Sequence, residues 1–348
     1  MTACLHVVAP GLLTTLQDHG RIGYQHLGVP VSGALDPVSL QAANLLVGNA
    51  PGAGALEVAC LGPTLAVEAD DVRIAVAGAT AVLEILPDVS ATSGRRVAPL
   101  QSMRLRRGEA LRIGALTGAT VLYVAVEGGF DIAPVLGSVS TDIRGGIGGW
   151  QGRALATGDR LPLRLAQAGD RGEVCLESFA VRPRARVRVI KGPQDDYFSD
   201  REVAAFLDCE YTVGPSADRM GMRLTGHKLQ HSHGFDIASD AIAPGSIQVP
   251  GHGQPIVLLA DRQTTGGYPK IATVISADLP ALARLPVGAK VAFEAVTVEA
   301  AEAARRAHVA ELAAMQDRIV PLRRSGAEIV PRLLECNLVS GVVDAAAA

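Results

Sequence analysis

The chain has 348 residues, of which 48% are hydrophobic, 19% are charged and 3% are aromatic. This composition supplies a buried core and excludes a disordered or collagen-like chain, and the length suggests two domains. The formal net charge of −3 provides no basic field for a phosphate backbone, and few aromatic rings are available to stack on bases. We therefore expect a folded protein that does not bind nucleic acid.

The cysteine pattern and the N-terminal residues both favour a cytoplasmic protein. The five cysteines are widely spaced without a CxxC pair, which is typical of reduced thiols rather than of a disulfide framework. The N-terminus lacks a positively charged segment and reaches Pro10-Gly11 before a long apolar run, so we expect no signal peptide. The longest apolar run, residues 74–83, is shorter than the about 20 residues that span a bilayer, so we expect no membrane anchor.

Most of residues 1–298 carries a β pattern, with short runs of Val, Ile and Leu separated by Gly, Pro and Asp. This spacing leaves little room for crossover helices and favours antiparallel barrels or sandwiches. Strands are expected at 72–77, 110–113, 121–126, 187–190, 256–259 and 290–293.

Three segments predict helices. Residues 37–47 follow Asp36, a candidate N-cap, and begin with a proline. Residues 200–207 form a shorter candidate. Apolar residues recur at three- or four-residue steps from 298 to 315, which predicts an amphipathic C-terminal helix that packs on a barrel or on a partner chain.

An internal repeat suggests that the β region is duplicated. RIGYQHLG (21–28) and RMGMRLTG (219–226) share one arginine and two glycines at the same spacing, each after a strand-like run and a Gly/Pro turn. We infer two similar β domains followed by a helix and tail. The expected limits are 1–182, 187–298 and 299–348.

Residues 261–270 form the most unusual polar segment, because they separate two apolar runs by more than the two to five residues of a plain hairpin. Asp261 and Lys270 are candidates for a base and an electrophile, or for a simple ion pair. The alternative is an ordered hairpin that crosses a barrel end. We predict a functional site here, with substrate bound by Gln248, Gln254, Gln263, Thr264, Thr265, Gly266, Gly267 and Tyr268.

Two further polar segments carry arginines. In residues 14–36, Arg21 is a candidate clamp for a carboxylate or phosphate, or a partner of Asp18 or Asp36 that fixes the loop. Residues 137–152 contain Arg144, a candidate substrate-binding residue, and many glycines. Their spacing misses the dinucleotide-binding pattern, and the chain has no P-loop motif.

Two other kinds of site are not predicted. His227, His231 and His233 form an HxxxHxH cluster, but neither cysteine nor carboxylate is patterned around it, so we expect no metal site. The chain also lacks the GxSxG motif of serine hydrolases.

These segments together resemble one family, allophanate hydrolase subunit 2, also called the carboxyltransferase A/B-type domain. The resemblance covers about residues 5–298 and rests on several long motifs in the same order. They are APGLLTTLQDHGRIGYQHLGVPVSGALD (9–36), NLLVGN (44–49), LEVACLGP (56–63), GSVSTDIRGGIGG (137–149), SADRMGMRLTG (216–226) and GSIQVPGHGQPIVLLADRQTTGGYPKIATVI (245–275).

The resemblance implies a mainly β protein of two tandem cyclophilin-like barrels that works beside a subunit 1 homologue. In bacterial members, that pair and a third, LamB-like subunit convert 5-oxoproline to glutamate with ATP, and Mg²⁺ is a candidate companion of the nucleotide. In urea carboxylase, the related region transfers a carboxyl group from biotin to urea. This chain has no biotinyl Met-Lys-Met motif, so biotin would arrive on another protein. A third reading is a regulatory partner that sequesters its subunit 1 homologue, as the Kip antagonist does.

Both chemistries require a small amide or lactam to be held while charge develops on its oxygen or nitrogen. In the ATP reading, Arg21, Arg219 and Lys270 are expected to hold the phosphate of a phosphorylated amide. In the biotin reading, Asp261 or a partner residue removes a proton from the amide nitrogen. The first reading is the C subunit of an ATP-dependent 5-oxoprolinase, because the chain carries no biotin machinery.

Overall fold

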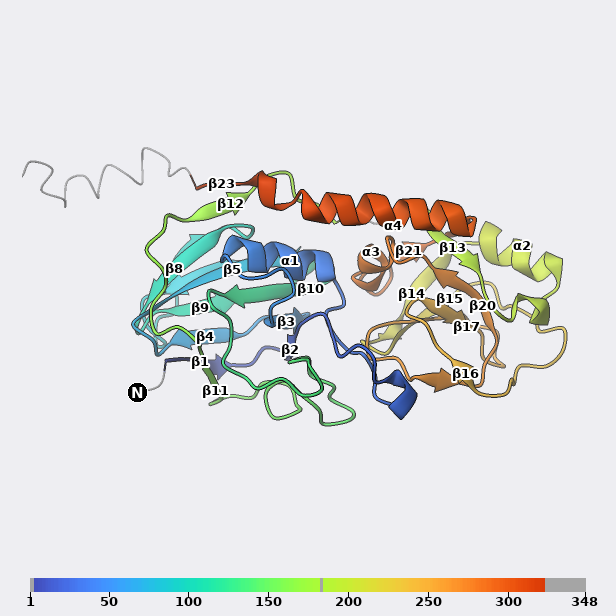
Figure 1. The fold of residues 1–348 in the computed structure, drawn as a ribbon, viewed down its shortest axis with the longest axis horizontal. Helices are drawn as coiled ribbons and strands as arrows, with labels where there is room; N and C mark the ends of the chain where they lie inside the picture. Colours follow the sequence, from blue (N-terminus) through green and yellow to red (C-terminus); the bar gives the residue numbers. More distant parts are fainter. Residues whose placement is uncertain (1–2, 182–183, 323–348) are drawn as a thin grey trace, which may run out of the picture.

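The computed structural model describes residues 3–181 and 184–322 of the chain. It shows two β barrels side by side, with the long helix α4 (Val298–Ala313) lying along both of them (Figure 1). The predicted mainly β architecture of two tandem barrels with a C-terminal helix is confirmed. Of the expected limits, residues 182 and 183 and the tail 323–348 lie outside the described residues, so the exact domain boundaries stay a prediction.

The first barrel consists of two antiparallel sheets whose apolar faces enclose one core. One sheet has the strand order β11-β1-β4-β9-β6-β7, and the other has the order β2-β3-β10-β5-β8. The strands are β1 (Cys4–Ala9), β2 (Leu13–Gln17), β3 (Ala55–Ala59), β4 (Thr64–Val67), β5 (Asp71–Thr80), β6 (Leu83–Leu86), β7 (Arg95–Val97), β8 (Ser102–Arg106), β9 (Ala110–Ile113), β10 (Thr117–Val126) and β11 (Arg160–Pro162).

Helix α1 (Pro37–Leu46) covers the outer face of β5 and β10, as predicted from its start signal. The Asp36 carboxylate accepts hydrogen bonds from the backbone N–H groups of Val38 and Ser39, both at 3.1 Å. These bonds satisfy two of the free donors at the start of the helix. The cap also fixes Asp36 at the border with the second barrel, where Arg284 binds its carboxylate.

The second barrel is one eight-stranded sheet in the order β21-β14-β15-β18-β17-β20-β13-β22, with β13 and β22 parallel. Its strands are β13 (Val187–Lys191), β14 (Tyr211–Ala217), β15 (Gly221–Thr225), β17 (Ser246–Gln248), β18 (Ile256–Leu258), β20 (Lys270–Val274), β21 (Lys290–Val291) and β22 (Phe293–Ala295). The expected strand 290–293 is thus divided between β21 and β22. Helices α2 (Asp200–Asp208) and α3 (Leu279–Ala283) accompany the barrel, and β16 (Asp240–Ala241) pairs with β19 (Thr265–Gly266) outside it.

Helix α4 leads the chain from the second barrel back to the first (Figure 1). The Thr297 side chain accepts a hydrogen bond from the backbone N–H of Ala300 and caps its start. Beyond its end, Met315 is buried against α1, and β23 (Ile319–Pro321) pairs with β12 (Val174–Leu176) beside the first barrel. The helix itself buries no residue completely. No helix among the described residues is both long and apolar enough to cross a membrane.

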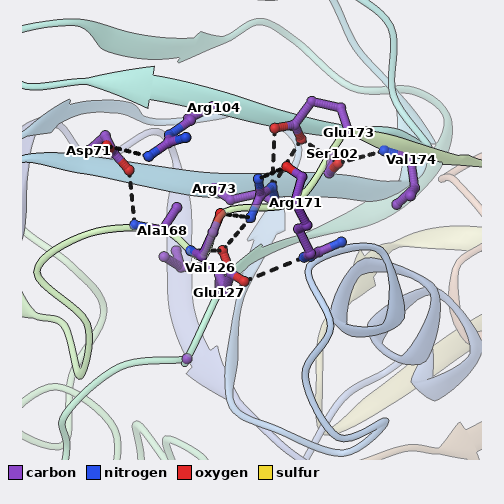
Figure 2. A network of polar contacts seen from close by, with 12 residues as sticks. Asp71, Arg73, Ser102, Arg104, Val126, Glu127, Ala168, Arg171, Glu173 and Val174 are labelled. Carbon is purple, nitrogen blue, oxygen red and sulfur yellow. Dashed lines mark hydrogen bonds and ion pairs between the residues drawn. The ribbon is translucent and has the colours of Figure 1, made fainter. Parts of the chain in front are cut away.

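A buried ion network attaches the segment before β12 to the first barrel (Figure 2). The Arg73 side chain on β5 is fully buried and donates to Glu127 at 2.6 Å and to Glu173 at 3.1 Å. Its remaining Nη2 donates to the carbonyl of Arg171 at 2.6 Å. The Ser102 hydroxyl donates to Glu173 as well. The Arg73 guanidinium therefore joins strand β5 to Glu127, just after β10, and to residues 171–173, just before β12.

Candidate functional site at the junction of the barrels

Arg219 lies in the turn between β14 and β15 and connects the two barrels. Its Nε and Nη2 donate to the two carboxylate oxygens of Asp261, at 2.8 and 3.0 Å. Its Nη1 donates to Glu57 on β3 of the first barrel, and Nη2 also donates to the carbonyl of Gly33 at 2.6 Å. Arg219 is therefore fully engaged and fixes the orientation of Asp261.

The first barrel holds Glu57 in place for this contact. The Tyr123 hydroxyl on β10 donates to Glu57 Oε2 at 2.5 Å, and the backbone N–H of Leu35 donates to the same oxygen at 2.9 Å. The backbone N–H of Asp36 in turn donates to the Tyr123 hydroxyl at 2.9 Å. The chain of contacts thus runs from the cap of α1 through Tyr123 and Glu57 to Arg219 and Asp261.

A second buried ion pair crosses the junction. Arg284, just after α3, donates to the Asp36 carboxylate at 3.0 Å, and the Ser39 hydroxyl donates to the same oxygen at 2.5 Å. Burial raises the pKa of Asp36, and the attraction of Arg284 opposes that rise. The pair joins α1 to the second barrel.

Burial and neighbouring charge set the protonation states of this network. Burial alone lowers the pKa of Arg219, but the carboxylates of Glu57 and Asp261 outweigh it and raise that pKa. Burial also raises the pKa of Tyr123 well above its usual value, with Glu57 adding to the effect. Arg219 is therefore a cation and Tyr123 a neutral hydrogen-bond donor at neutral pH.

Arg21 is buried beside the same junction but is only partly engaged. Its Nη2 donates to the carbonyl of Ser140, while Nε and Nη1 are buried without a hydrogen-bond partner among the described residues. Burial lowers its pKa, and the charges of Asp18, Asp142 and Asp261 oppose this. The expected alternative of an ion pair with Asp18 or Asp36 is not found within residues 3–181. Asp18 instead accepts bonds from its own neighbours and from residues 138–140, and Asp36 pairs with Arg284.

Asp261 and Lys270 lie apart, although the sequence allowed them to form an ion pair. The ammonium of Lys270 instead binds Asp240 at 2.9 Å, and Asp261 binds Arg219. The ion-pair reading is therefore wrong, because each residue finds a partner outside the 261–270 segment. Lys270 begins strand β20 and is itself almost completely buried.

Gln248 and Gln263 meet beneath the short strand β19. Gln263 Nε2 donates to Gln248 Oε1 at 3.4 Å, while Gln248 Nε2 and Gln263 Oε1 are buried without partners among the described residues. A buried amide without a partner is costly. The pair therefore holds one amide donor and one carbonyl acceptor that are buried and unpaired among the described residues.

Gly266 keeps this amide pair in place, because a Cβ there would lie 2.6 Å from Gln248 Nε2 and 2.7 Å from Ile242 Cδ1. We expect Gly266→Ala to displace Gln248 and to cost about 1–3 kcal/mol of stability. Gly267→Ala is the matched control, since its Cβ would meet no atom closer than 3.5 Å. Urea unfolding of both variants measures this loss of stability, and equal losses for the two variants would contradict the role of Gly266.

The other predicted site residues are more scattered. Gln254 exchanges two hydrogen bonds with the backbone of Gly226, and Tyr268 is exposed. Thr264, Gly267 and Thr265 make backbone contacts beside β16, and Arg144 is an exposed residue 3.8 Å from Asp218. The structure thus brings Arg219 and Asp261 together near Arg21, and Gln248 and Gln263 together, but does not join all of the predicted residues.

The histidine cluster is dispersed. His231 contacts the Val249 carbonyl at 2.9 Å, His227 lies 3.3 Å from Glu202, and His233 packs edge-on against Tyr197. Within the described residues, no group of three or more His, Cys, Asp or Glu side chains is arranged to hold a metal ion.

Sequence reasoning missed Glu57, Tyr123 and Arg284. Glu57 gave a signal, since it is a single carboxylate in the otherwise apolar strand LEVA and is only 3% exposed. A charge on a buried strand requires a partner. The identity of that partner depends on how the two barrels meet, which no local pattern reveals.

Residues 27–295 match the family model described as carboxyltransferase domain, subdomain A and B. The chain belongs to this carboxyltransferase domain family. Arg219, Asp261 and the 261–270 segment all lie within the matched range, as does Glu57.

Relatives within the carboxyltransferase domain family include both small subunits and large enzymes. The chain is 37% identical to the C subunit of 5-oxoprolinase from Escherichia coli over 306 residues, which cover 87% of this chain and 94% of that protein. It is 29% identical to urea amidolyase of Saccharomyces cerevisiae, but spans 17% of that protein. The crystal structure of the K. lactis urea amidolyase has a TM-score of 0.81 with 26% identity, covering 93% of this chain and 21% of that one.

Proposed function

We propose that the chain is the C subunit of an ATP-dependent 5-oxoprolinase. One observation carries this proposal: the alignment with the E. coli protein runs over nearly the whole of both chains. The reaction consumes 5-oxoproline, ATP and water and yields glutamate, ADP and phosphate. The partners are a subunit 1 homologue and a LamB-like protein, which supply the remainder of the site.

Asp261 is the group that we assign to proton transfer at the reacting amide. Its two oxygens are held by Arg219, and Arg219 is held by Glu57, so the carboxylate is oriented by both barrels. A fixed orientation lowers the cost of reaching the reactive geometry. The buried amides of Gln248 and Gln263 suit the neutral carbonyl and N–H of a lactam.

Arg21 is the group that we assign to the negative charge that develops on the amide oxygen or its phosphate. Arg219 and Lys270, the other two candidates, already bind carboxylates. Arg21 retains two buried donors, Nε and Nη1, without partners among the described residues. Donors fixed in advance at a developing anion lower the barrier for its formation.

Tyr123 serves this site as a positioning residue, because its hydroxyl orients Glu57 and therefore Arg219. We expect Tyr123→Phe to lower kcat of the reconstituted enzyme about tenfold, with KM little changed, since a hydrogen bond to a charged group is worth about 1.5–3 kcal/mol. Tyr211→Phe is the matched control: Tyr211 is equally buried, and its hydroxyl has no partner among the described residues. Equal kcat values for the two variants would contradict the positioning role.

A biotin-dependent carboxyltransferase is the second candidate function. The K. lactis urea amidolyase structure, which superimposes on 93% of this chain, favours it. In this reading, biotin arrives on another protein, and Asp261 removes a proton from the amide nitrogen of the acceptor.

Reconstitution with one component omitted tests the proposal. The chain is combined with its subunit 1 homologue and its LamB-like partner, and ATP-dependent release of glutamate from 5-oxoproline is measured with and without it. We expect glutamate release to require all three proteins. Release that is undiminished when this chain is omitted would refute the proposal, and partner binding without any turnover would favour a regulatory role.

A further inference from the structure

A cavity of about 450 Å³ lies beneath α4 and reaches the start of α1 at Val38, next to the Asp36 cap. Its walls come from the inner side of α4 with Ala304, from Val38 of α1, from residues 178–181 beside the first barrel and from residues 277–281 of the second. Its volume falls within the range of about 300–1,000 Å³ that is usual for small-molecule sites.

The lining combines an apolar surface with an excess of positive charge. Phe179, Leu312 and Met315 contribute apolar side chains, and three arginines face two carboxylates. One of these arginines, Arg188, is neutralised by Asp278 through bonds of 2.6 and 3.0 Å. The other two arginines, at positions 184 and 318, then face one carboxylate, Glu311, so the lining keeps a net surplus of one cation.

The guanidinium groups of these two arginines have few hydrogen-bond partners among the described residues. The Nε of Arg318 is buried without a hydrogen-bond partner among the described residues, and its two Nη groups make long contacts, of 3.3 and 3.5 Å, to the carbonyls of Ser178 and Glu311. Arg184 forms no ion pair within residues 3–181 and 184–322, and its side chain is exposed at the rim. A guanidinium with free donors beside an apolar wall favours an anion that also carries apolar surface.

We propose that this cavity is a binding site for an organic anion with an apolar body, such as an aromatic or medium-chain acid. The acidic group binds Arg318 and Arg184, and the apolar body lies against Phe179 and Leu312. Such a ligand contacts both barrels and α4 together. Because it binds the folded state, it stabilises the arrangement of all three.

Two fluorescent probes with the same rings test this proposal on the full chain. Anilinonaphthalene sulfonate carries an anionic group, and phenylnaphthylamine lacks it. We expect the sulfonate to bind as one molecule per chain, at least about tenfold more tightly than the neutral probe, because only the sulfonate accepts charged hydrogen bonds from the arginines. Equal affinity for the two probes would overturn the proposal.

Substitutions locate the binding. Ala304→Phe fills the cavity and is expected to weaken both probes at least about tenfold, while Ala303→Phe, at the exposed neighbouring position of α4, leaves both unchanged. Arg318→Met is expected to remove the preference for the sulfonate, and Arg318→Lys to retain part of it. Full binding by Ala304→Phe would overturn the proposal even if the Arg318 variants fail to fold.

Discussion

Asp261→Asn is expected to lower turnover of the reconstituted enzyme about 10²–10⁴-fold, the usual contribution of a general acid or base. Asparagine keeps the shape of the side chain and one acceptor for Arg219, but it cannot take up a proton. Glutamate release measures the loss, and circular dichroism verifies that the fold is retained. We expect Gln263→Ala to abolish turnover as well, since it removes half of the amide pair.

Asp218→Asn is the matched control for Asp261→Asn. Asp218 lies next to Arg219 in the same turn, but it is exposed and forms only a long contact with Arg144, at 3.8 Å. Exposed ion pairs contribute little, so turnover should stay near the level of the parent protein. Normal turnover by Asp261→Asn would return the 261–270 segment to a structural role.

Arg73→Met is expected to destabilise the first barrel by about 3–5 kcal/mol, because it leaves Glu127 and Glu173 without their shared cation (Figure 2). The protein contains one tryptophan, Trp150, which packs against the core of the first barrel. Its fluorescence during urea unfolding therefore reports on that barrel.

Arg104→Met provides the comparison for this stability measurement. Arg104 lies on the neighbouring strand β8 and binds Asp71 at 2.8 Å, but its side chain is 36% exposed. We expect its removal to cost less than about 1 kcal/mol. If Arg73→Met costs no more than Arg104→Met, the buried network does not hold the barrel together.

The local elements of the fold could be predicted from sequence because their signals are local. Asp36 and Pro37 mark the start of α1, and the spacing of apolar residues marks α4. The polar segment 261–270 stood out for the same reason. Contacts between the barrels have no such signal: Arg219 and Glu57 are 162 residues apart in the chain, and their meeting depends on how the barrels pack.

The repeated motif shows most clearly that a local sequence pattern does not predict long-range contacts. Arg21 and Arg219 occupy equivalent places in RIGYQHLG and RMGMRLTG, and both were candidates to hold a phosphate. In the structure, Arg219 binds two carboxylates, whereas Arg21 binds one carbonyl and has two donors without a partner in residues 3–181 and 184–322. The surroundings, which differ between the barrels, decide what each arginine is able to do.

The most direct test of the proposed 5-oxoprolinase role is to measure which substrate stimulates ATP hydrolysis by the reconstituted complex. ADP release is measured with 5-oxoproline and, separately, with urea and bicarbonate in the presence of a biotin carboxylase and its biotinyl carrier protein. We predict stimulation by 5-oxoproline, matched by an equal amount of glutamate, and none by urea. Stimulation by urea alone, with carboxylated urea as the product, would contradict the assignment and favour the carboxyltransferase.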